Sequence, residues 1–251
     1  MMPQNNLNQD LFFQEIDKIL SAAKEEAVTM RLLGATAVRT HSESAKKMAG
    51  ERVLTDLDFV AYKKDRRKIE KLLTKLNYSP STGFNMAHGD ERLLFFGNDE
   101  KLKIDVWLEV FRMAHTFNFK KRLELDYPTL PLSDLLMTKL QIVQLNEKDL
   151  RDIICLLSDH ELSQNDDDRE KINVARLLEE TSENWGIYKT FTVNLAKVRE
   201  LGPSYIEDGD RILKKVDEIL NAIETAPKTL SWKVRAKIGE KRPWYESPDV
   251  R

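Results

Sequence analysis

The segment from Asp56 to Tyr62 constrains the fold more than any other part of the chain. It reads Asp-Leu-Asp-Phe-Val-Ala-Tyr, which after its first residue has the composition of a β-strand. Side chains alternate across a strand, so Asp56 and Asp58 project from one face while Leu57 and Phe59 project from the other. The segment therefore predicts a strand that buries its apolar side chains against helices and presents two carboxylates together.

Strand and helix patterns alternate through the first two thirds of the chain. Short apolar or alternating runs predict strands at 31–38, 56–62, 93–96, 102–108 and 122–125, with a hairpin turn at 97–100. Apolar residues at helical spacing predict helices at 11–30, 64–76, 132–145 and 149–157. We expect the α+β fold class, with a sheet that contains an antiparallel hairpin and is flanked by helices.

The chain changes character after residue 162. Residues 163–168 are a polar run of Ser, Gln, Asn and Asp, which predicts a hinge. Beyond it only helical patterns remain, at 169–180, 187–201 and 206–223, and these predict a small helical bundle. We therefore expect two domains, 1–162 with its core near 30–157, and 163–251 with a basic tail.

The basic tail begins at residue 228 and contains the aromatic residues Trp232, Trp244 and Tyr245. Two interpretations of this tail remain open. Lysines and indole rings are the groups that bind phosphates and bases in nucleic-acid contacts. The helical spacing of Trp232, Arg235 and Ile238 instead predicts a last helix that packs its indole onto the bundle, and we favour packing.

Composition excludes several classes of protein. The chain has 40 Lys and Arg against 42 Asp and Glu, so its net charge of -2 gives no overall attraction to nucleic acid or anionic lipid. Its single cysteine, Cys155, lies in an apolar run and is expected to be buried and inert. The four histidines are scattered, which argues against zinc. With no signal peptide or membrane-spanning run in the sequence, we expect a cytoplasmic protein without a membrane partner.

The carboxylates of Asp56 and Asp58 indicate a metal site. Two like charges this close repel each other unless a cation lies between them, and Mg²⁺ prefers a few carboxylate oxygens beside water and phosphate oxygens. Asp105, between the apolar Ile104 and Val106, supplies a third carboxylate if its strand is a neighbour. Such a trio suits a phosphoryl or nucleotidyl displacement, because metal ions stabilise its attacking and leaving oxygens.

Residues upstream of the acidic strand fit the same chemistry. Gly34 lets the backbone approach a phosphate closely, and the amides of Ala35 and Thr36 donate to phosphate oxygens if a helix starts there. Each feature also has an ordinary interpretation. An Asp-X-Asp pair is commonly a solvated loop or a helix cap, and Asp105 alone is explained as a surface residue of a hairpin.

The order of these motifs resembles the nucleotidyltransferase superfamily, in which a strand with glycine precedes an Asp-X-Asp strand and a later isolated aspartate. Four segments are also similar to abortive-infection type IV toxin nucleotidyltransferases (AbiEii-like): 34–38, 55–59, 138–140 and 150–152. The match covers roughly residues 30–157. The chain departs from the family pattern in two respects. Ala35 stands in place of a second Gly or Ser, and apolar Cys155 and Leu156 stand where a further Asp commonly lies.

The resemblance implies a fold and a set of roles. The fold is a nucleotidyltransferase-like mixed sheet with flanking helices, followed by a C-terminal helical bundle. The implied roles are Mg²⁺ binding by Asp56 and Asp58, completion of the site and activation of the acceptor hydroxyl by Asp105, phosphate contact by Lys139, and support by Arg151 and Asp152. The ordinary interpretation of Lys139 is a solvent-facing helical lysine, because Leu136, Leu140 and Val143 already form an apolar stripe.

These features together predict a magnesium-dependent enzyme. It transfers a nucleoside monophosphate from a nucleoside triphosphate to a hydroxyl acceptor, which is RNA such as tRNA, a protein or a small molecule. The resemblance to toxins further implies a toxin–antitoxin system with an antitoxin partner. The alternative is a nucleotide-binding or interaction protein that keeps the fold without the chemistry.

Overall fold

The computed structural model describes residues 9–48, 54, 56–97 and 100–247. By their contacts these residues group into two compact units. Unit 1 comprises residues 1–37, 48–111 and 117–130, and unit 2 comprises 38–47, 112–116 and 131–251. Within the described residues, no helix is both long enough and apolar enough to cross a membrane.

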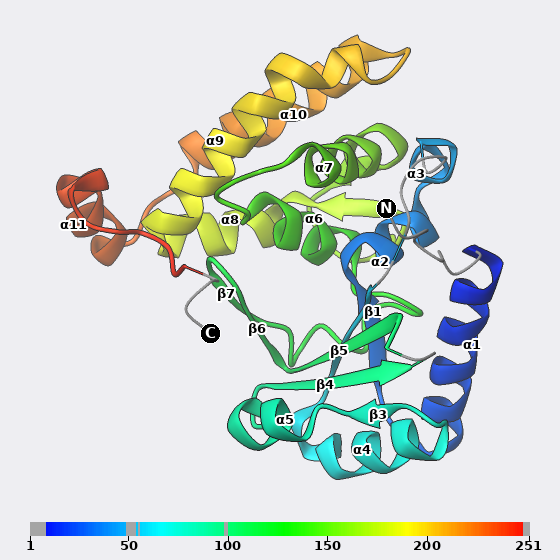
Figure 1. The fold of residues 1–251 in the computed structure, drawn as a ribbon. Helices are drawn as coiled ribbons and strands as arrows, with labels where there is room; N and C mark the ends of the chain where they lie inside the picture. The colour runs from blue at the N-terminus through cyan, green and yellow to red at the C-terminus, as the bar shows by residue number, and fades with distance from the viewer. Residues whose placement is uncertain (1–8, 49–53, 55, 98–99, 248–251) are drawn as a thin grey trace, which may run out of the picture. The chain divides into compact units, whose positions relative to one another are not determined.

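Unit 1 is built on one five-stranded mixed sheet (Figure 1). Its strands are β1 (Met30–Leu33), β2 (Asp56–Ala61), β3 (Ser79–Pro80), β4 (Arg92–Gly97) and β5 (Leu102–Leu108). Their order in space is β1-β2-β5-β4-β3. The central pair β2 and β5 is parallel, whereas β1 on β2, β4 on β5 and β3 on β4 are antiparallel.

The helices of unit 1 are α1 (Gln9–Glu25), α4 (Arg66–Lys75) and α5 (Thr82–His88), with the 3₁₀ turn η2 (Lys63–Asp65) before α4. The buried residues of α4 are Ile69, Leu72 and Leu73, at the i, i+3, i+4 spacing of one helical face. Figure 1 shows α4 and α5 beside β3 and β4. The apolar face of the sheet is fully buried, with Leu57 and Phe59 both at zero exposure.

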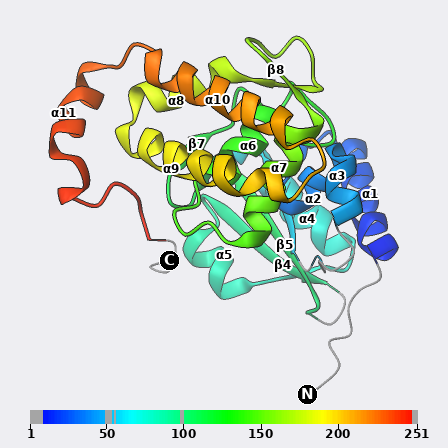
Figure 2. The same cartoon turned by 90° about the horizontal axis from the view of Figure 1, so that it is seen from above.

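Unit 2 is predominantly helical. Its main helices are α6 (Leu132–Leu140), α7 (Glu147–Asp159), α8 (Val174–Glu183), α9 (Trp185–Leu201), α10 (Gly209–Thr225) and α11 (Leu230–Ile238). The long helices α9 and α10 run side by side (Figure 2). Asn146, Asn173, Asn184, Asp208 and Thr229 each accept a backbone N–H as the side-chain N-cap of a helix.

Short elements complete the chain. They are α2 (Gly34–His41), α3 (Glu43–Met48), the strands β6 (Val110–Arg112), β7 (Thr116–Asn118), β8 (Glu161–Ser163) and β9 (Lys171–Asn173), and the 3₁₀ turns η3 (Gly202–Ser204) and η4 (Gly239–Lys241). Strands β6 and β7 form a two-stranded sheet, and β8 pairs in parallel with β9. The predicted α+β class, a mixed sheet with flanking helices followed by a helical region, is confirmed.

Several predicted elements are wrong in extent or type. The strand predicted at 31–38 ends at Leu33, because Gly34 at φ +73° turns the chain into α2. The first helix ends at Glu25 rather than continuing to Met30, which lies in β1. Residues 122–125 form turns rather than a strand, and α5 has no counterpart in the prediction.

The helices α6 and α7 belong by their contacts to unit 2, together with the helices that follow them. The prediction had grouped them with the sheet, in a domain ending at residue 162. A boundary at that residue stays a prediction about which parts fold independently.

The last helix, α11, contains no buried residue. The Trp232 ring meets the Tyr188 ring of α9 edge to face, with 5.0 Å between centroids. In contrast, Leu230 is 77% exposed and Val234 is also exposed. Packing of the tail through Trp232, the favoured prediction, is therefore present. Arg235 adds a contact over the Trp185 ring at 4.7 Å, and Trp244 adds a hydrogen bond from its Nε1 to Oγ1 of Thr190 at 3.2 Å.

Candidate active site

The two predicted acidic strands are neighbours. In the parallel pairing of β2 with β5, Asp58 lies directly opposite Asp105, and Asp56 lies opposite Lys103. Residues paired in register project from the same face of a sheet, so all three carboxylates share one face. Asp56 is exposed, Asp58 is partly exposed and Asp105 is 1% exposed. The condition on which the role of Asp105 depended is therefore met.

Gly34 is fitted to this acidic face. It follows Leu33, which pairs with Asp58 across β1 and β2, and its φ of +73° is a left-handed conformation that favours glycine. A Cβ atom on Gly34 would lie only 2.4 Å from Oδ2 of Asp58. The backbone thus leaves this space to the carboxylate, and the same turn starts α2, with Ala35 and the buried Thr36 in its first turn.

Asp105 is held by two cations. Its Oδ1 lies 2.7 Å from Nε of Arg92, and its Oδ2 lies 2.7 Å from Nζ of Lys103. Arg92 comes from β4, opposite Trp107 of β5, and its guanidinium carbon lies 4.4 Å from the centroid of the Trp107 ring. Burial of a carboxylate is costly unless it is paired, and both oxygens of Asp105 are paired here.

The arrangement of the three carboxylates determines whether they fit a divalent cation. Within the described part of the chain, no group of three or more His, Cys, Asp or Glu is arranged to hold a metal ion. The predicted ligand set Asp56, Asp58 and Asp105 is therefore not gathered around one point, because Asp105 pairs with Arg92 and Lys103. Asp56 and Asp58 on one face fit Mg²⁺ on their own, since this ion commonly takes one or two carboxylates beside substrate phosphates.

The remaining predicted site residues belong to unit 2. Lys139 is buried, and its Nζ lies 2.8 Å from both Oδ1 of Asp149 and Oδ2 of Asp152. Burial alone would lower the pKa of Lys139, but the carboxylates of Asp152 and Asp149 outweigh it and raise the pKa. Lys139 is thus not the solvent-facing lysine of the ordinary interpretation, and its contact with phosphate stays a prediction.

Arg151 and Asp152, predicted as supporting residues, have different surroundings. Asp152 is buried beside Lys139, whereas Arg151 donates from Nη2 to Oε1 of Glu147 at 2.8 Å and lies over the Tyr205 ring. Cys155, one turn further along α7, is buried as predicted, and burial raises the pKa of its thiol to about 12. Within unit 2, the structure brings Lys139 and Asp152 together.

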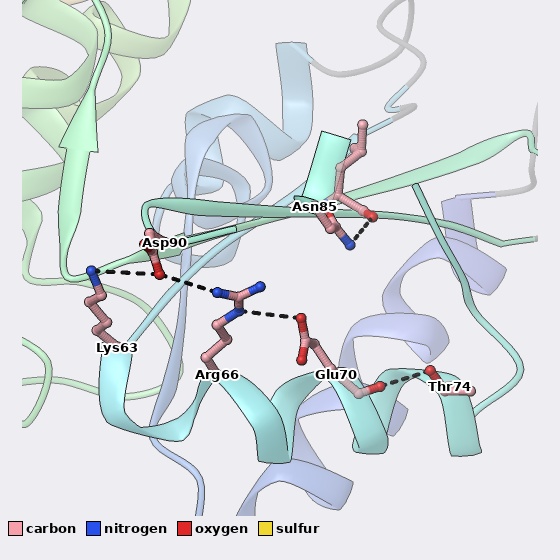
Figure 3. Close-up of polar contacts among 7 residues, drawn as sticks. Lys63, Arg66, Glu70, Thr74, Asn85 and Asp90 are labelled. Atoms are coloured by element: carbon pink, nitrogen blue, oxygen red, sulfur yellow. Dashed lines mark hydrogen bonds and ion pairs between the residues drawn. The ribbon is translucent and has the colours of Figure 1, made fainter. Parts of the chain in front are cut away.

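The opposite face of the sheet has a pocket of about 250 Å³. Its lining residues are Arg66, Glu70, Thr74, Pro80, Thr82, Asn85, Met86 and Phe95. Phe95 pairs with Ile104, so it projects away from the face that carries Asp105. Several polar groups here already have partners within the protein (Figure 3). Asn85, for example, donates from Nδ2 to Leu94 O and accepts from Leu94 N.

Sequence reasoning missed three residues around these sites. The position of Lys103 could have been predicted, because it precedes Asp105 by two residues on the same strand and must share its face. The position of Arg92 could not have been predicted from the sequence, because it depends on the register of β4 against β5. Asp149, the second partner of Lys139, lies near it only through the packing of α6 on α7.

Comparison with known proteins identifies no family for this chain. No protein-family model matches the chain, and no curated protein matches it. Among solved structures, the antibiotic-resistance factor ANT(2'')-Ia is similar at 13% identity and a TM-score of 0.38, over 57% of this chain and 80% of that one. A likeness this distant says nothing about what this chain acts on, and the resemblance to abortive-infection toxins stays a prediction.

Proposed function

We propose that this protein is a magnesium-dependent nucleotidyltransferase. The observation that carries the proposal is the direct pairing of Asp58 with Asp105 across parallel strands, with Gly34 fitted to the Asp58 carboxylate. A divalent cation offsets the repulsion between two carboxylates on one face of a sheet, and the face that bears Asp56 and Asp58 also bears cationic side chains. An acidic pair beside basic groups matches a metal ion with its polyphosphate.

The residues have distinct roles in this proposal. Asp56 and Asp58 hold the divalent cation, which when bound supplies positive charge to the phosphate oxygens of the nucleotide. Gly34 leaves room for close approach, and the amides of Ala35 and Thr36 in the first turn of α2 donate to phosphate oxygens. Lys139, which the resemblance implies as a phosphate contact supported by Arg151 and Asp152, is buried against Asp149 and Asp152 and has no phosphate contact in this proposal.

The reaction moves a nucleoside monophosphate. An acceptor hydroxyl oxygen bonds to the α-phosphorus, the bond from that phosphorus to its leaving bridging oxygen breaks, and pyrophosphate departs with the electron pair. The hydroxyl proton passes to a base, the role proposed for Asp105. Because each Asp105 oxygen lies 2.7 Å from a cation, one ion pair must open before this carboxylate accepts the proton.

A binding function without chemistry is the second candidate. The observation that favours it is the same pair of contacts, since a carboxylate with both oxygens on cations is not poised as a base. In this alternative the protein binds a metal–nucleotide complex and no transfer follows. The two functions differ in whether a nucleotide label becomes covalently attached to another molecule.

The test is a labelling experiment with Asp58→Asn. Wild-type protein, Asp58→Asn and Glu70→Gln are incubated in cell extract with Mg²⁺ and each α-labelled nucleoside triphosphate, and label is followed into RNA, protein and small molecules. Loss of a metal-holding carboxylate removes several kcal/mol of transition-state stabilisation, so we expect transfer to fall about a thousandfold or more. Glu70→Gln, which alters the opposite face, is expected to transfer as wild type does.

The labelled fraction identifies the acceptor as RNA such as tRNA, protein or small molecule. If the acceptor is RNA or protein, we propose that the enzyme also has an antitoxin partner. Equal labelling by wild type and Asp58→Asn would show that the site is misplaced. Nucleotide binding with no label in any fraction would favour the second candidate.

A further inference from the structure

Arg92 has donors to spare on the acidic face of the sheet. Its Nε donates to Oδ1 of Asp105 at 2.7 Å. Among the described residues, its two terminal nitrogens have no hydrogen-bond partner, and the side chain is partly exposed. A guanidinium carries five N–H donors in a fixed plane, and two parallel donors match the oxygens of a carboxylate or phosphate. Arg92 is therefore equipped to hold an oxyanion while it stays on Asp105.

The plane of the Arg92 guanidinium is fixed by two aromatic rings. Its central carbon lies 4.4 Å from the Trp107 ring centroid and 5.6 Å from that of Phe84. Cation–π contacts of this kind orient a guanidinium before any ligand arrives. Less conformational freedom is then lost on binding, which increases affinity.

Lys103 adds a second cation next to Arg92. Its ammonium has three donors, one of which is directed at Oδ2 of Asp105, and its side chain is also partly exposed. Asp105, Arg92 and Lys103 together carry a net charge of +1, from one carboxylate and two cations. Lys103 also lies opposite Asp56, so this cationic group directly adjoins the proposed metal ligands.

We infer that Arg92 and Lys103 form an oxyanion site for the polyphosphate of a nucleotide, with Asp105 as the residue that positions both cations. The inference rests on the proposed function and deepens it, because it says which side chains bind the phosphates. Neighbouring strands are about 4.8 Å apart and residues rise about 3.3 Å along a strand. Asp58 lies opposite Asp105 and Arg92 opposite Trp107, so two strand spacings and two residues of offset place the backbones of Asp58 and Arg92 about 12 Å apart. A metal ion at the first and a terminal phosphate at the second suit an extended polyphosphate.

Arg66, on the opposite face of the sheet, differs from Arg92 in the number of acids that it contacts. Its Nε donates to Glu70 at 3.3 Å and its Nη1 to Asp90 at 3.2 Å, and Figure 3 shows both carboxylates directed at the guanidinium. The pocket beside it thus meets a guanidinium already engaged by two acids. Arg92 faces a single acid and keeps its terminal nitrogens for a ligand.

The test is calorimetric binding of inorganic tripolyphosphate and of a nucleoside triphosphate, each with Mg²⁺, to the full chain. The variants are Arg92→Gln, Arg92→Lys and Lys103→Gln. The matched controls are Arg67→Gln on α4 and Lys101→Gln in the β4–β5 turn, both of which change exposed side chains. A lost hydrogen bond to a charged group weakens binding about tenfold to a hundredfold, and we expect this for both ligands in Arg92→Gln and Lys103→Gln.

Arg92→Lys keeps the charge without the planar fork, so its affinity is expected between wild type and Arg92→Gln. Both controls are expected to bind as wild type does. Thermal unfolding of every variant is measured alongside. If Arg92→Gln does not fold, the affinity of Lys103→Gln tests the oxyanion site instead. This variant is expected to fold, because Asp105 still pairs with Arg92.

The outcomes separate this inference from the proposed function. Unchanged affinity in folded Arg92→Gln and Lys103→Gln, with wild type binding both ligands, overturns the oxyanion site and leaves nucleotidyl transfer standing. Binding that depends on Arg92 without transfer in the labelling experiment supports the oxyanion site and overturns the proposed function. Failure of wild type to bind either ligand overturns both.

Discussion

Two charge clusters in this protein have the same composition with the signs of charge reversed. Around Asp105 one buried carboxylate meets two cations at 2.7 Å, and around Lys139 one buried ammonium meets two carboxylates at 2.8 Å. The partners differ in exposure. Arg92 and Lys103 are 27% and 35% exposed, whereas Asp149 and Asp152 are only 16% and 8% exposed.

The difference in exposure distinguishes the cluster proposed to bind phosphate, around Asp105, from the closed cluster around Lys139. Cations that face solvent keep donors for a ligand, and Asp105, Arg92 and Lys103 sum to a net charge of +1. Asp56 and Asp58 on the same face bring the sum to -1, so attraction of an anion requires the divalent cation that these two carboxylates would hold. The Lys139 cluster is closed and has a net charge of -1, so it offers an anion neither donors nor attraction. Its main effect is expected on the packing of α6 against α7.

The largest effect in this comparison is expected from Lys139→Met. Removing the ammonium leaves the two carboxylates of Asp149 and Asp152 uncompensated, and breaking a buried ion pair costs about 3–5 kcal/mol. Chemical denaturation measures the fall in unfolding free energy. In protein that remains folded, nucleotide affinity is expected to stay within about twofold of wild type, because surface and structural changes away from a site change binding little.

The matched control is Lys214→Met on α10, which removes an exposed ammonium and is expected to change stability by less than about 0.5 kcal/mol. The structural role of the Lys139 cluster would be contradicted if Lys139→Met is as stable as this control but loses nucleotide binding. Lys139 would then be the phosphate contact that the sequence resemblance implies.

A smaller effect is expected from Gly34→Ala. A left-handed conformation costs a residue with a Cβ about 1–2 kcal/mol, and the new atom would lie 2.4 Å from Oδ2 of Asp58. We expect lower stability by that amount together with weaker Mg²⁺-dependent nucleotide binding, because the carboxylate must move. Thermal unfolding and calorimetry measure the two effects.

Gly83→Ala on α5 is the control for this change. No atom lies within 4 Å of a Cβ built on Gly83, and alanine is favoured over glycine inside a helix by up to about 1 kcal/mol. This variant is expected to be as stable as wild type or more so, with unchanged binding. If the two glycine variants behave alike, Gly34 has no special relation to Asp58.

The sequence predicted the acidic face well because that prediction needs only local rules. Alternation along β2 places Asp56 and Asp58 together whatever the rest of the fold. The position of Asp105 required one further assumption, that its strand adjoins β2, and the parallel register confirms it. The helical stripe of α4 was predictable for the same local reason.

The parts that escaped prediction depend on tertiary packing. Arg92 lies 13 residues before Asp105 and reaches it only through the antiparallel register of β4 on β5. Lys139 lies off the apolar stripe of α6, yet α7 buries it. Gly34 ends β1 early because its backbone adopts φ +73°, which apolar composition alone does not reveal.

The most direct test of the metal–nucleotide site is thermal unfolding of wild type and Asp58→Asn with each nucleoside triphosphate, with and without Mg²⁺. A ligand at a hundred times its Kd stabilises the folded state by about 2.7 kcal/mol. We predict stabilisation of wild type that requires Mg²⁺ and is absent in Asp58→Asn. Equal stabilisation of both proteins by the same nucleotide would contradict the assignment of the acidic face as the nucleotide site.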